Sequence, residues 1–205
     1  MLRRTSINYI NSIIEKNNEW KILDIGCGYS ANKKATTIAD VQDFSSYYKG
    51  KNFVKVNEKI LPFKDKEFDF VISSHVIEHV EDFQFFIKEL ERISSKGYIE
   101  LPTRLGDNLV FENLEDHIWW FIYDDINNVI ICSKKNQLIE PFISVSLARL
   151  FNEIFRESMV LELYWENTID YKIDNIIQQR GLKKITFLKL IKKYFSKKIR
   201  KLIKF

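Results

Sequence analysis

The sequence predicts an α/β fold with a mostly parallel sheet and helices on both of its faces. Short apolar runs rich in β-branched residues alternate with segments whose apolar residues recur every three or four positions. One apolar run also ends in a glycine pair, Gly26 and Gly28, although the chain has only six glycines. Strands that alternate with helices form right-handed βαβ units, which build a parallel sheet.

The first half of the chain supplies the elements of this sheet. Residues 5–17 have the apolar spacing of a helix, which Thr5 or Ser6 could cap. Four strands are expected at residues 20–25, 35–41, 52–56 and 68–74, a helix at 79–94, and a fifth strand at 98–102 after the turn at Lys96 and Gly97.

The pattern changes after Pro102. Residues 117–134 predict a β-hairpin that turns at 124–128, and residues 143–155 predict a helix. Residues 159–165 and 168–173 predict strands that complete the sheet as antiparallel edge strands. From about Asn175 the pattern is again helical. We therefore expect a domain over residues 1–174, with its core motifs in 20–102 and an elaboration in 103–174, followed by a tail at 175–205.

The charge of the chain is unevenly distributed. The formal net charge is +4, but residues 180–205 carry eleven basic residues and no acid, which leaves 21 basic and 28 acidic residues in the rest. The apolar residues of this tail recur at helical steps, which predicts a basic amphipathic helix. It could lie on an anionic membrane, or pack on its own domain or on a partner protein. Nucleic acid is disfavoured, because the aromatic residues do not interleave with the lysines.

Several classes of protein are disfavoured by composition. Hydrophobic residues make up 45% of the chain, which argues against disorder. No apolar run is long enough to span a membrane, and the first residues lack the apolar segment of a signal peptide. The two cysteines form neither a disulfide framework nor a zinc pattern, and no histidine–carboxylate spacing indicates a metal site. We expect a cytoplasmic protein, with its tail in peripheral contact with the inner face of the membrane.

The glycine pair indicates a ligand site. Residues 26–31 fit the pattern G-x-G-x-x-G/A, which is typical of dinucleotide-binding turns between a strand and a helix. Asp40 ends the next strand, where an acid can accept hydrogen bonds from ribose hydroxyls. Asp24, however, lies two residues before Gly26, and a carboxylate there suits a ligand with an ammonium group better than a pyrophosphate.

The run LPFKDKEFDFVISSHVIEHVED at residues 61–82 decides between these ligands. Together with DIGCG at residues 24–28, it resembles class I S-adenosylmethionine-dependent methyltransferases, and the likeness covers roughly residues 20–102. The resemblance implies a Rossmann-like fold and S-adenosyl-L-methionine as the cofactor. The residues that it assigns to the cofactor are Asp24, Gly26, Cys27, Gly28, Asp40, Val41, Asn57, Ser74 and His75.

Each of these positions has an implied task. The glycines let the backbone approach the methionine moiety and the ribose, and Asp24 orients the amino group of the cofactor. Asp40 accepts from the ribose, and Val41 packs on the adenine. Asn57 stands where the family commonly has an aspartate, and its amide oxygen can still accept a hydrogen bond from the adenine amine.

Transfer of the methyl group to a hydroxyl requires a base that removes the proton. The candidates are Glu78, His79 and His117. For Glu78 and His79 the alternative is a capping network at the start of a helix, and for His117 it is packing. His75 is a second histidine at the pocket, which could simply form its wall.

The acceptor is predicted from the second half of the chain. The segments that follow Pro102 resemble small methyltransferases encoded among cell-surface glycan genes, which implies O-methylation of a saccharide hydroxyl on a glycan or glycolipid precursor. Trp119, Trp120 and Trp165 would suit stacking on a sugar ring, unless they fill the core. The alternatives are methylation of a small lipophilic metabolite such as a quinone, and an inactive cofactor-binding module that partners another enzyme.

Overall fold

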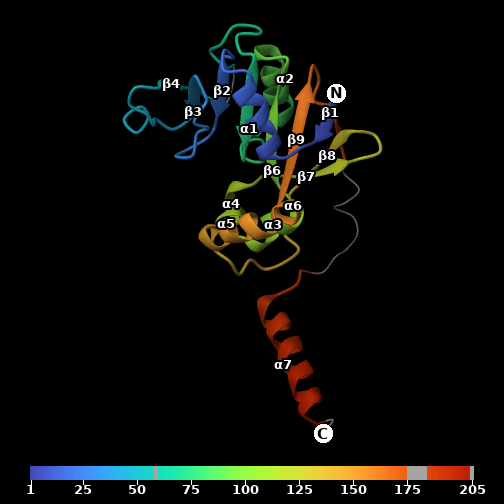
Figure 1. Cartoon of the computed structure of the whole chain (residues 1–205). Helices are drawn as coiled ribbons and strands as arrows, with labels where there is room; N and C mark the ends of the chain where they lie inside the picture. Colours follow the sequence, from blue (N-terminus) through green and yellow to red (C-terminus); the bar gives the residue numbers. More distant parts are fainter. Residues whose placement is uncertain (58–59, 175–183, 204–205) are drawn as a thin grey trace.

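A seven-stranded sheet forms the centre of the molecule (Figure 1). The structure is a computed structural model that describes residues 1–57, 60–174 and 184–203. The strand order is β4-β3-β2-β5-β6-β9-β1. The strands are β1 (Leu2–Arg4), β2 (Ile22–Ile25), β3 (Thr37–Asp40), β4 (Asn52–Lys55), β5 (Phe70–Ser74), β6 (Lys96–Pro102) and β9 (Val160–Glu166).

The five central strands β2 to β6 are parallel, as predicted. The chain runs from β2 outward to β3 and β4 and then crosses to β5 on the other side of β2. The strand order therefore reverses between β2 and β5, and ligands of such sheets bind outside the carboxyl ends of the strands at this point. The predicted strand at 159–165 is β9, but it is not an edge strand, because it pairs antiparallel with β6 on one side and with β1 on the other.

Alternate side chains of the strands face two separate cores. Helix α1 (Ile7–Lys16), which the Ser6 side chain caps, buries Ile10 and Ile14 on one face of the sheet. Helix α2 (Phe83–Ile93) begins at the Asp82 side chain and covers the other face. Its buried apolar residues are the five expected from helical spacing, namely Phe83, Phe86, Ile87, Leu90 and Ile93.

Among the described residues, no helix follows the glycine turn. No described residue between β2 and β3, or between β3 and β4, is helical. Residues 29–34 contain only two apolar side chains, Tyr29 and Ala31, and so lack the stripe that would hold a helix on the sheet. Instead the hydroxyl of Tyr48 fixes this loop, donating to the carbonyl of Gly28 (2.7 Å) and accepting from the amide of Ala31 (3.1 Å). The glycine turn therefore lacks the helix that typically follows the G-x-G-x-x-G/A pattern.

A second, three-stranded sheet covers the same face as α2. The predicted hairpin is confirmed as β7 (Trp119–Asp124) and β8 (Val129–Lys134). Strand β10 (Tyr171–Ile173) pairs with β8 in parallel, so the prediction that residues 168–173 complete the main sheet is wrong. The inner face of this small sheet is aromatic and apolar, and it packs against α2. Phe121, Tyr123 and Ile130 lie in the same hydrophobic core as the buried residues of α2.

Four helices gather where β6 ends and β9 begins (Figure 1). They are α3 (Arg104–Leu109), α4 (Asn113–Asp116), α5 (Val145–Ile154) and α6 (Arg156–Met159). Helix α7 (Phe187–Ile203) extends away from this body and buries no side chain. Residues 175–183 and 204–205 of the predicted tail lie outside the described residues. Among the helices of the described part, none is both long and apolar enough to cross a membrane.

Candidate functional site

Two cavities meet at Gly26, at the carboxyl end of β2. The larger has a volume of about 590 Å³ and reaches from the glycine turn to α3, α4 and α5. The smaller has a volume of about 70 Å³ and lies beside the end of β3. Every residue predicted to bind the cofactor lines one of the two cavities: Asp24, Gly26, Cys27, Gly28, Ser74 and His75 line the larger, and Gly26, Asp40, Val41 and Asn57 line the smaller.

The glycine turn brings bare backbone to both cavities. Gly26 has φ +70° and Gly28 has φ +53°, a region that favours glycine. A Cβ atom on Gly26 would lie 2.4 Å from Cγ2 of Val76, whereas one on Gly28 would meet nothing within 4 Å. A side chain at Gly26 would therefore clash with Val76 as well as fill space needed by a ligand. Val76 itself lines the smaller cavity, so its displacement would also change the shape of that cavity.

Asp24 is a buried carboxyl group at the wall of the larger cavity. Its Oδ2 accepts a hydrogen bond from the amide of Asn32 (2.6 Å), while its buried Oδ1 has no hydrogen-bond partner among the described residues. Desolvation raises the pKa of Asp24 to about 7, against the effect of the Asn32 hydrogen bond, and the nearby charge of Asp40 adds to the rise. A cationic ligand group would supply the missing partner and favour the ionised form.

The smaller cavity has the character of a slot for a flat apolar group. Val41, Val56 and Leu61 are among its walls, and Asn57 supplies an amide at its edge. Asp40 stands at its end, where Oδ2 accepts from the amide of Gly28 (3.0 Å) and Oδ1 from that of Gln42 (2.9 Å). This carboxylate ties the glycine turn to β3 and lies where a ribose would join an adenine in the slot.

His75 follows β5 with a left-handed backbone, φ +55°, which is uncommon for a residue other than glycine. Its side chain is 38% exposed, and it lies between two carboxylates: Nδ1 is 3.2 Å from Glu78 and Nε2 is 3.1 Å from Glu100. Burial lowers the pKa of His75, but the hydrogen bonds to Glu100 and Glu78 outweigh this and raise it to about 10. His75 is therefore an imidazolium at neutral pH and cannot act as a base.

Glu100 is held ionised by this cation and by a second network behind it. Desolvation would raise the pKa of Glu100, but the hydrogen bond and charge of His75 dominate and hold it at about 2. Tyr98 lies between Glu100 (2.5 Å) and Glu162 (2.8 Å), and Arg156 pairs with both carboxylates. Glu100 was not predicted from the sequence, although an acid inside the apolar strand YIELP was a signal of such a site.

His79 and His117 face each other at the acceptor side of the larger cavity. Their rings are perpendicular, with centroids 4.5 Å apart, and both line the cavity. Nδ1 of His79 lies 3.0 Å from the carbonyl oxygen of Asp116, so it donates there. Nδ1 of His117 lies 2.5 Å from the buried carboxylate of Asp107. In a neutral ring, each Nε2 therefore carries the lone pair.

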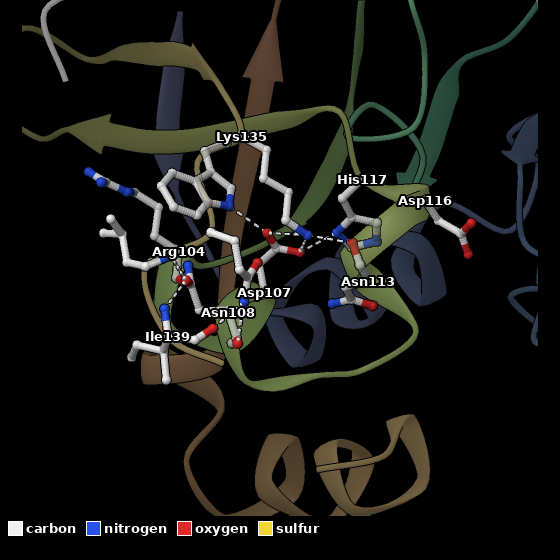
Figure 2. A network of polar contacts seen from close by, with 12 residues as sticks. Arg104, Asp107, Asn108, Asn113, Asp116, His117, Lys135 and Ile139 are labelled. Atoms are coloured by element: carbon white, nitrogen blue, oxygen red, sulfur yellow. Dashed lines mark hydrogen bonds and ion pairs between the residues drawn. The ribbon is translucent and has the colours of Figure 1, made fainter. Parts of the chain in front are cut away.

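Asp107 organises the surroundings of His117, as Figure 2 shows. Its carboxylate also accepts from Nε1 of Trp120 (2.5 Å) and pairs with Lys135 (3.2 Å). Burial would raise the pKa of Asp107, but His117 and Lys135 lower it, so Asp107 stays ionised. Asp107 was not predicted from the sequence, because its partners follow it at separate places: His117 just after α4, Trp120 in β7 and Lys135 just after β8.

Two expectations do not fit this geometry. Glu78 is 0% exposed and is not among the residues that line the cavity, so it cannot touch an acceptor directly and instead holds His75. The tryptophans do not line either described cavity. Trp120 and Trp165 are fully buried, and the indole of Trp119 packs on Phe83 and donates to the carbonyl of Val80. The interpretation of these three residues as a sugar platform is wrong, because they fill the core.

The acceptor half of the cavity carries polar groups that the sequence analysis did not select. They are Asn113 and Asp116 on α4, and Arg149 and Asn152 on α5. Arg149 and Asn152 are one helical turn apart, together with Val145 and Ala148. This spacing was readable in the sequence, but nothing in the sequence indicated that α5 lies across the cleft.

The residues present fit S-adenosylmethionine. The unpartnered Oδ1 of Asp24 suits its ammonium group, and the left-handed backbone at Gly26 leaves room that a side chain would fill. The apolar slot beside Val41 and Leu61 suits its adenine, and Asp40 suits its ribose.

Comparison with known proteins agrees with this fit. The family model described as a methyltransferase domain matches residues 23–99. A ubiquinone biosynthesis O-methyltransferase of Pelagibacter ubique is 30% identical over 110 residues, which are 43% of each chain. The chain spans about half the length, or less, of the curated relatives it matches.

Solved structures with similar folds are distant. A methyltransferase from Aquifex aeolicus that depends on S-adenosylmethionine is 15% identical, with a TM-score of 0.40 over 75% of this chain and 87% of that one. CalH, solved in complex with S-adenosylhomocysteine, is 14% identical, with a TM-score of 0.39 over 46% of this chain and 35% of that one. Residues 23–99 match this methyltransferase domain, and the parallel strands that they build bring the residues that fit S-adenosylmethionine to one edge of the sheet.

Proposed function

We propose that the protein transfers the methyl group of S-adenosylmethionine to a hydroxyl of a saccharide, on a surface glycan or glycolipid precursor. The observation that carries this proposal is the polar wall of the larger cavity. Its volume of about 590 Å³ extends past the glycine turn to Asn113, Asp116, Arg149 and Asn152. Amides and charged groups of this kind can hydrogen-bond the many hydroxyls of a sugar.

The residues of the glycine turn and of the neighbouring strand ends would hold the cofactor. Asp24 would bind its ammonium group, Asp40 its ribose, and Val41 and Asn57 its adenine. When bound, the cofactor supplies an electrophilic methyl group on a sulfonium. The chain aligns this group with the acceptor, and alignment alone can account for several kcal/mol of the barrier.

Proton removal is proposed to occur at the pair His79 and His117. Both rings line the acceptor half of the cavity, and each has its Nδ1 fixed by an oxygen acceptor. His75 is excluded by its charge and Glu78 by its burial. Exchange of His79 or His117 for Gln should lower kcat while the Kd for S-adenosylmethionine stays near the parental value.

A second candidate acceptor is a small lipophilic hydroxy compound such as a quinol. It is favoured by the relative from Pelagibacter ubique, whose name assigns it to ubiquinone biosynthesis. The basic helix α7 would suit an enzyme that meets such a substrate at a cytoplasmic membrane face. A chain that binds the cofactor without turnover would instead be a partner module for another enzyme.

One experiment separates these proposals. The purified protein is incubated with S-adenosylmethionine and either a saccharide extract or a catechol-type quinol, and S-adenosylhomocysteine and methylated products are measured by mass spectrometry. Turnover with the saccharides alone supports the proposal, and turnover with the quinol alone replaces it with the second candidate. Cofactor binding without turnover on either, combined with an unchanged glycan mass in cells that lack the gene, favours the partner module.

A further inference from the structure

His79 and His117, which line the acceptor side of the larger cavity, and the buried Glu78 form a group that could hold one metal ion. Glu78, His79 and His117 each offer a ligand atom, and these atoms lie within 4.8 Å of one another. Ligand atoms around a tetrahedral zinc ion lie about 3.3 Å apart, given bonds of about 2.0–2.1 Å. Ligand atoms as far apart as 4.8 Å would have to approach by about 1.5 Å to hold such an ion, and His79 is the exposed member of the set.

Both histidines are already oriented as metal ligands usually are. A ligating histidine almost always donates its other ring N–H to a carboxylate or a carbonyl, which fixes the ring and its tautomer. Nδ1 of His117 is bound to the carboxylate of Asp107, and Nδ1 of His79 to the carbonyl of Asp116. Each histidine therefore has only Nε2 left to bind a cation.

Glu78 supplies the anionic ligand. Its Oε1 contacts His75, but its Oε2 is fully buried and has no hydrogen-bond partner among the described residues. A buried carboxylate oxygen without a partner is costly, and a bound cation would remove that cost. Sequence spacing could not reveal this set, because His117 follows His79 by a whole helix, a strand and two short helices.

We infer that Glu78, His79 and His117 form a site for one divalent transition-metal cation, of which Zn²⁺ fits the ligands best. Two histidines and one glutamate are a known ligand set of catalytic zinc, which keeps an open coordination position. Here that position would face the larger cavity, because His79 and His117 line it. The inference rests on the proposed methyl transfer and changes the task of the two histidines: with Nε2 bound to the cation, they hold the acceptor hydroxyl through the metal and do not take its proton.

The cation would explain how a hydroxyl becomes a nucleophile at this site. A Zn²⁺-bound hydroxyl loses its proton far more readily than a free one. The proton passes to solvent water, the oxygen forms its new bond to the methyl carbon, and the carbon–sulfur bond of the sulfonium breaks with both electrons kept by sulfur. One proton is released for each methyl ether formed, and no oxidant or reductant is needed.

The test measures metal binding without cofactor or acceptor. The full chain is stripped with a chelator and titrated with Zn²⁺ by calorimetry in the presence of a weak competing chelator. We expect one high-affinity site per chain. Co²⁺ as a probe should give the visible absorption of a four- or five-coordinate site, which a loosely hydrated surface ion does not give.

Matched variants locate the site. His79→Gln changes an exposed side chain and should leave the fold intact while lowering Zn²⁺ affinity at least tenfold. Glu78→Gln keeps the shape of the buried side chain and should have a similar effect. Asp116→Asn is the control: this exposed acid lines the same cavity, but it contacts His79 through its backbone carbonyl only, so Zn²⁺ affinity should stay within about twofold.

The outcomes distinguish the site from the proposed function. Absence of a stoichiometric Zn²⁺ site in the parent, or unchanged affinity in His79→Gln, overturns the inference even if methyl transfer proceeds. Zn²⁺ binding that the variants abolish, without methyl transfer to any acceptor, supports the site and contradicts the proposed function. If Asp116→Asn weakens Zn²⁺ binding as much as His79→Gln does, the ion binds to general negative charge and the inference fails.

Discussion

Gly26 and Gly28 share a left-handed backbone but differ in their surroundings. An alanine at either position incurs about 1–2 kcal/mol of backbone strain. Gly26→Ala must also displace Val76, whose Cγ2 would lie 2.4 Å from the new Cβ, whereas Gly28→Ala meets no protein atom within 4 Å. We expect Gly26→Ala to destabilise the protein by at least about 1 kcal/mol more than Gly28→Ala.

Urea unfolding of the two variants tests the stability difference, and calorimetric titration with S-adenosylmethionine tests the ligand. Gly28→Ala should weaken cofactor binding with little further loss of stability, because its Cβ enters the space of the cavity. Equal destabilisation by both substitutions would mean that the side chain of Val76 moves away from the new Cβ with no loss of stability.

The raised pKa of Asp24 makes stability depend on pH. Its pKa is about 7 in the folded protein and 3.8 in an unfolded chain, so between these values the folded state holds a proton that the unfolded state releases. Stability therefore falls as pH rises through this window, by at most about 1.4 kcal/mol per pH unit, and levels off above about pH 7. In Asp24→Asn this contribution should vanish. Urea unfolding at pH values from about 5 to 8 tests it, and a constant difference between the two proteins would contradict it.

Cofactor binding should show the opposite dependence. The ammonium group of S-adenosylmethionine binds the ionised form of Asp24, so its affinity should rise as pH increases through about 7. Titration calorimetry of the parent should show this rise, and Asp24→Asn should bind weakly at every pH. A parental Kd that does not change from about pH 6 to pH 8 would remove Asp24 from the ammonium site.

Local patterns identified the cofactor side of the site but not the acceptor side. Asp24, the glycines, Asp40 and Val41 lie within twenty residues, and the order of parallel strands brings them to one edge. The surroundings of His117 depend instead on Asp107 and Lys135, which meet only after α3 docks on the small sheet. The contact between α3 and the small sheet cannot be predicted from any periodicity of the sequence.

At the scale of elements, amphipathic spacing correctly predicted helices and strands, and segments without such spacing are loops. The helix α2 and the hairpin were predicted because their apolar residues recur with a clear period. The loops after β2 and β3 have no such period, and the first is held by the hydroxyl of Tyr48 and by the carboxylates of Asp24 and Asp40. The sheet to which β10 belongs was mispredicted. The protein has two sheets, and the residue pattern of a three-residue strand does not indicate which of them it joins.

Helix α2 also builds the wall of the cofactor slot. Arg92 pairs with Glu89 (2.7 Å) and donates to the carbonyls of Leu61 (3.0 Å) and Phe63 (2.7 Å), while Glu89 accepts from the amide of Leu61 (2.8 Å). Arg92→Leu would leave the Glu89 carboxylate buried without its partner and free the Leu61 segment. We expect a loss of about 2–3 kcal/mol in the free energy of unfolding and weaker cofactor binding.

A matched control uses the exposed partner of the same guanidinium. Asp65 contacts Arg92 at 3.0 Å, but its side chain is 79% exposed, so Asp65→Asn should change stability by less than about 1 kcal/mol. Urea unfolding of both variants measures the contrast. If Arg92→Leu costs no more than Asp65→Asn, α2 does not support the slot in this way.

At the scale of the whole molecule, charge and shape separate the body from the tail. The body is acidic, whereas α7 carries seven basic residues and no acid: Lys189, Lys192, Lys193, Lys197, Lys198, Arg200 and Lys201. The start of the tail contacts the body, where Phe187 stacks on Phe142 and donates to Glu140, but further along α7 apolar side chains are uncovered, with Leu188 and Leu202 each 77% exposed. We expect a membrane surface or a partner protein to cover the exposed apolar face of α7.

We expect α7 to dock on anionic lipid. Each basic residue near such a surface contributes about 1 kcal/mol, and the attraction decays over a Debye length of about 8 Å at physiological salt. The full chain should therefore co-sediment with phosphatidylglycerol vesicles, bind phosphatidylcholine vesicles weakly, and dissociate as salt is added. Replacing Leu188, Phe195 and Leu202 with Ser should reduce binding to phosphatidylglycerol, because the apolar face must enter the interface.

The control Ile126→Ser removes a side chain that is 90% exposed at the turn of the hairpin, and should bind like the parent. Equal binding of the parent to both lipids, or no loss in the triple variant, would exclude the membrane and leave the apolar face of α7 to a partner protein.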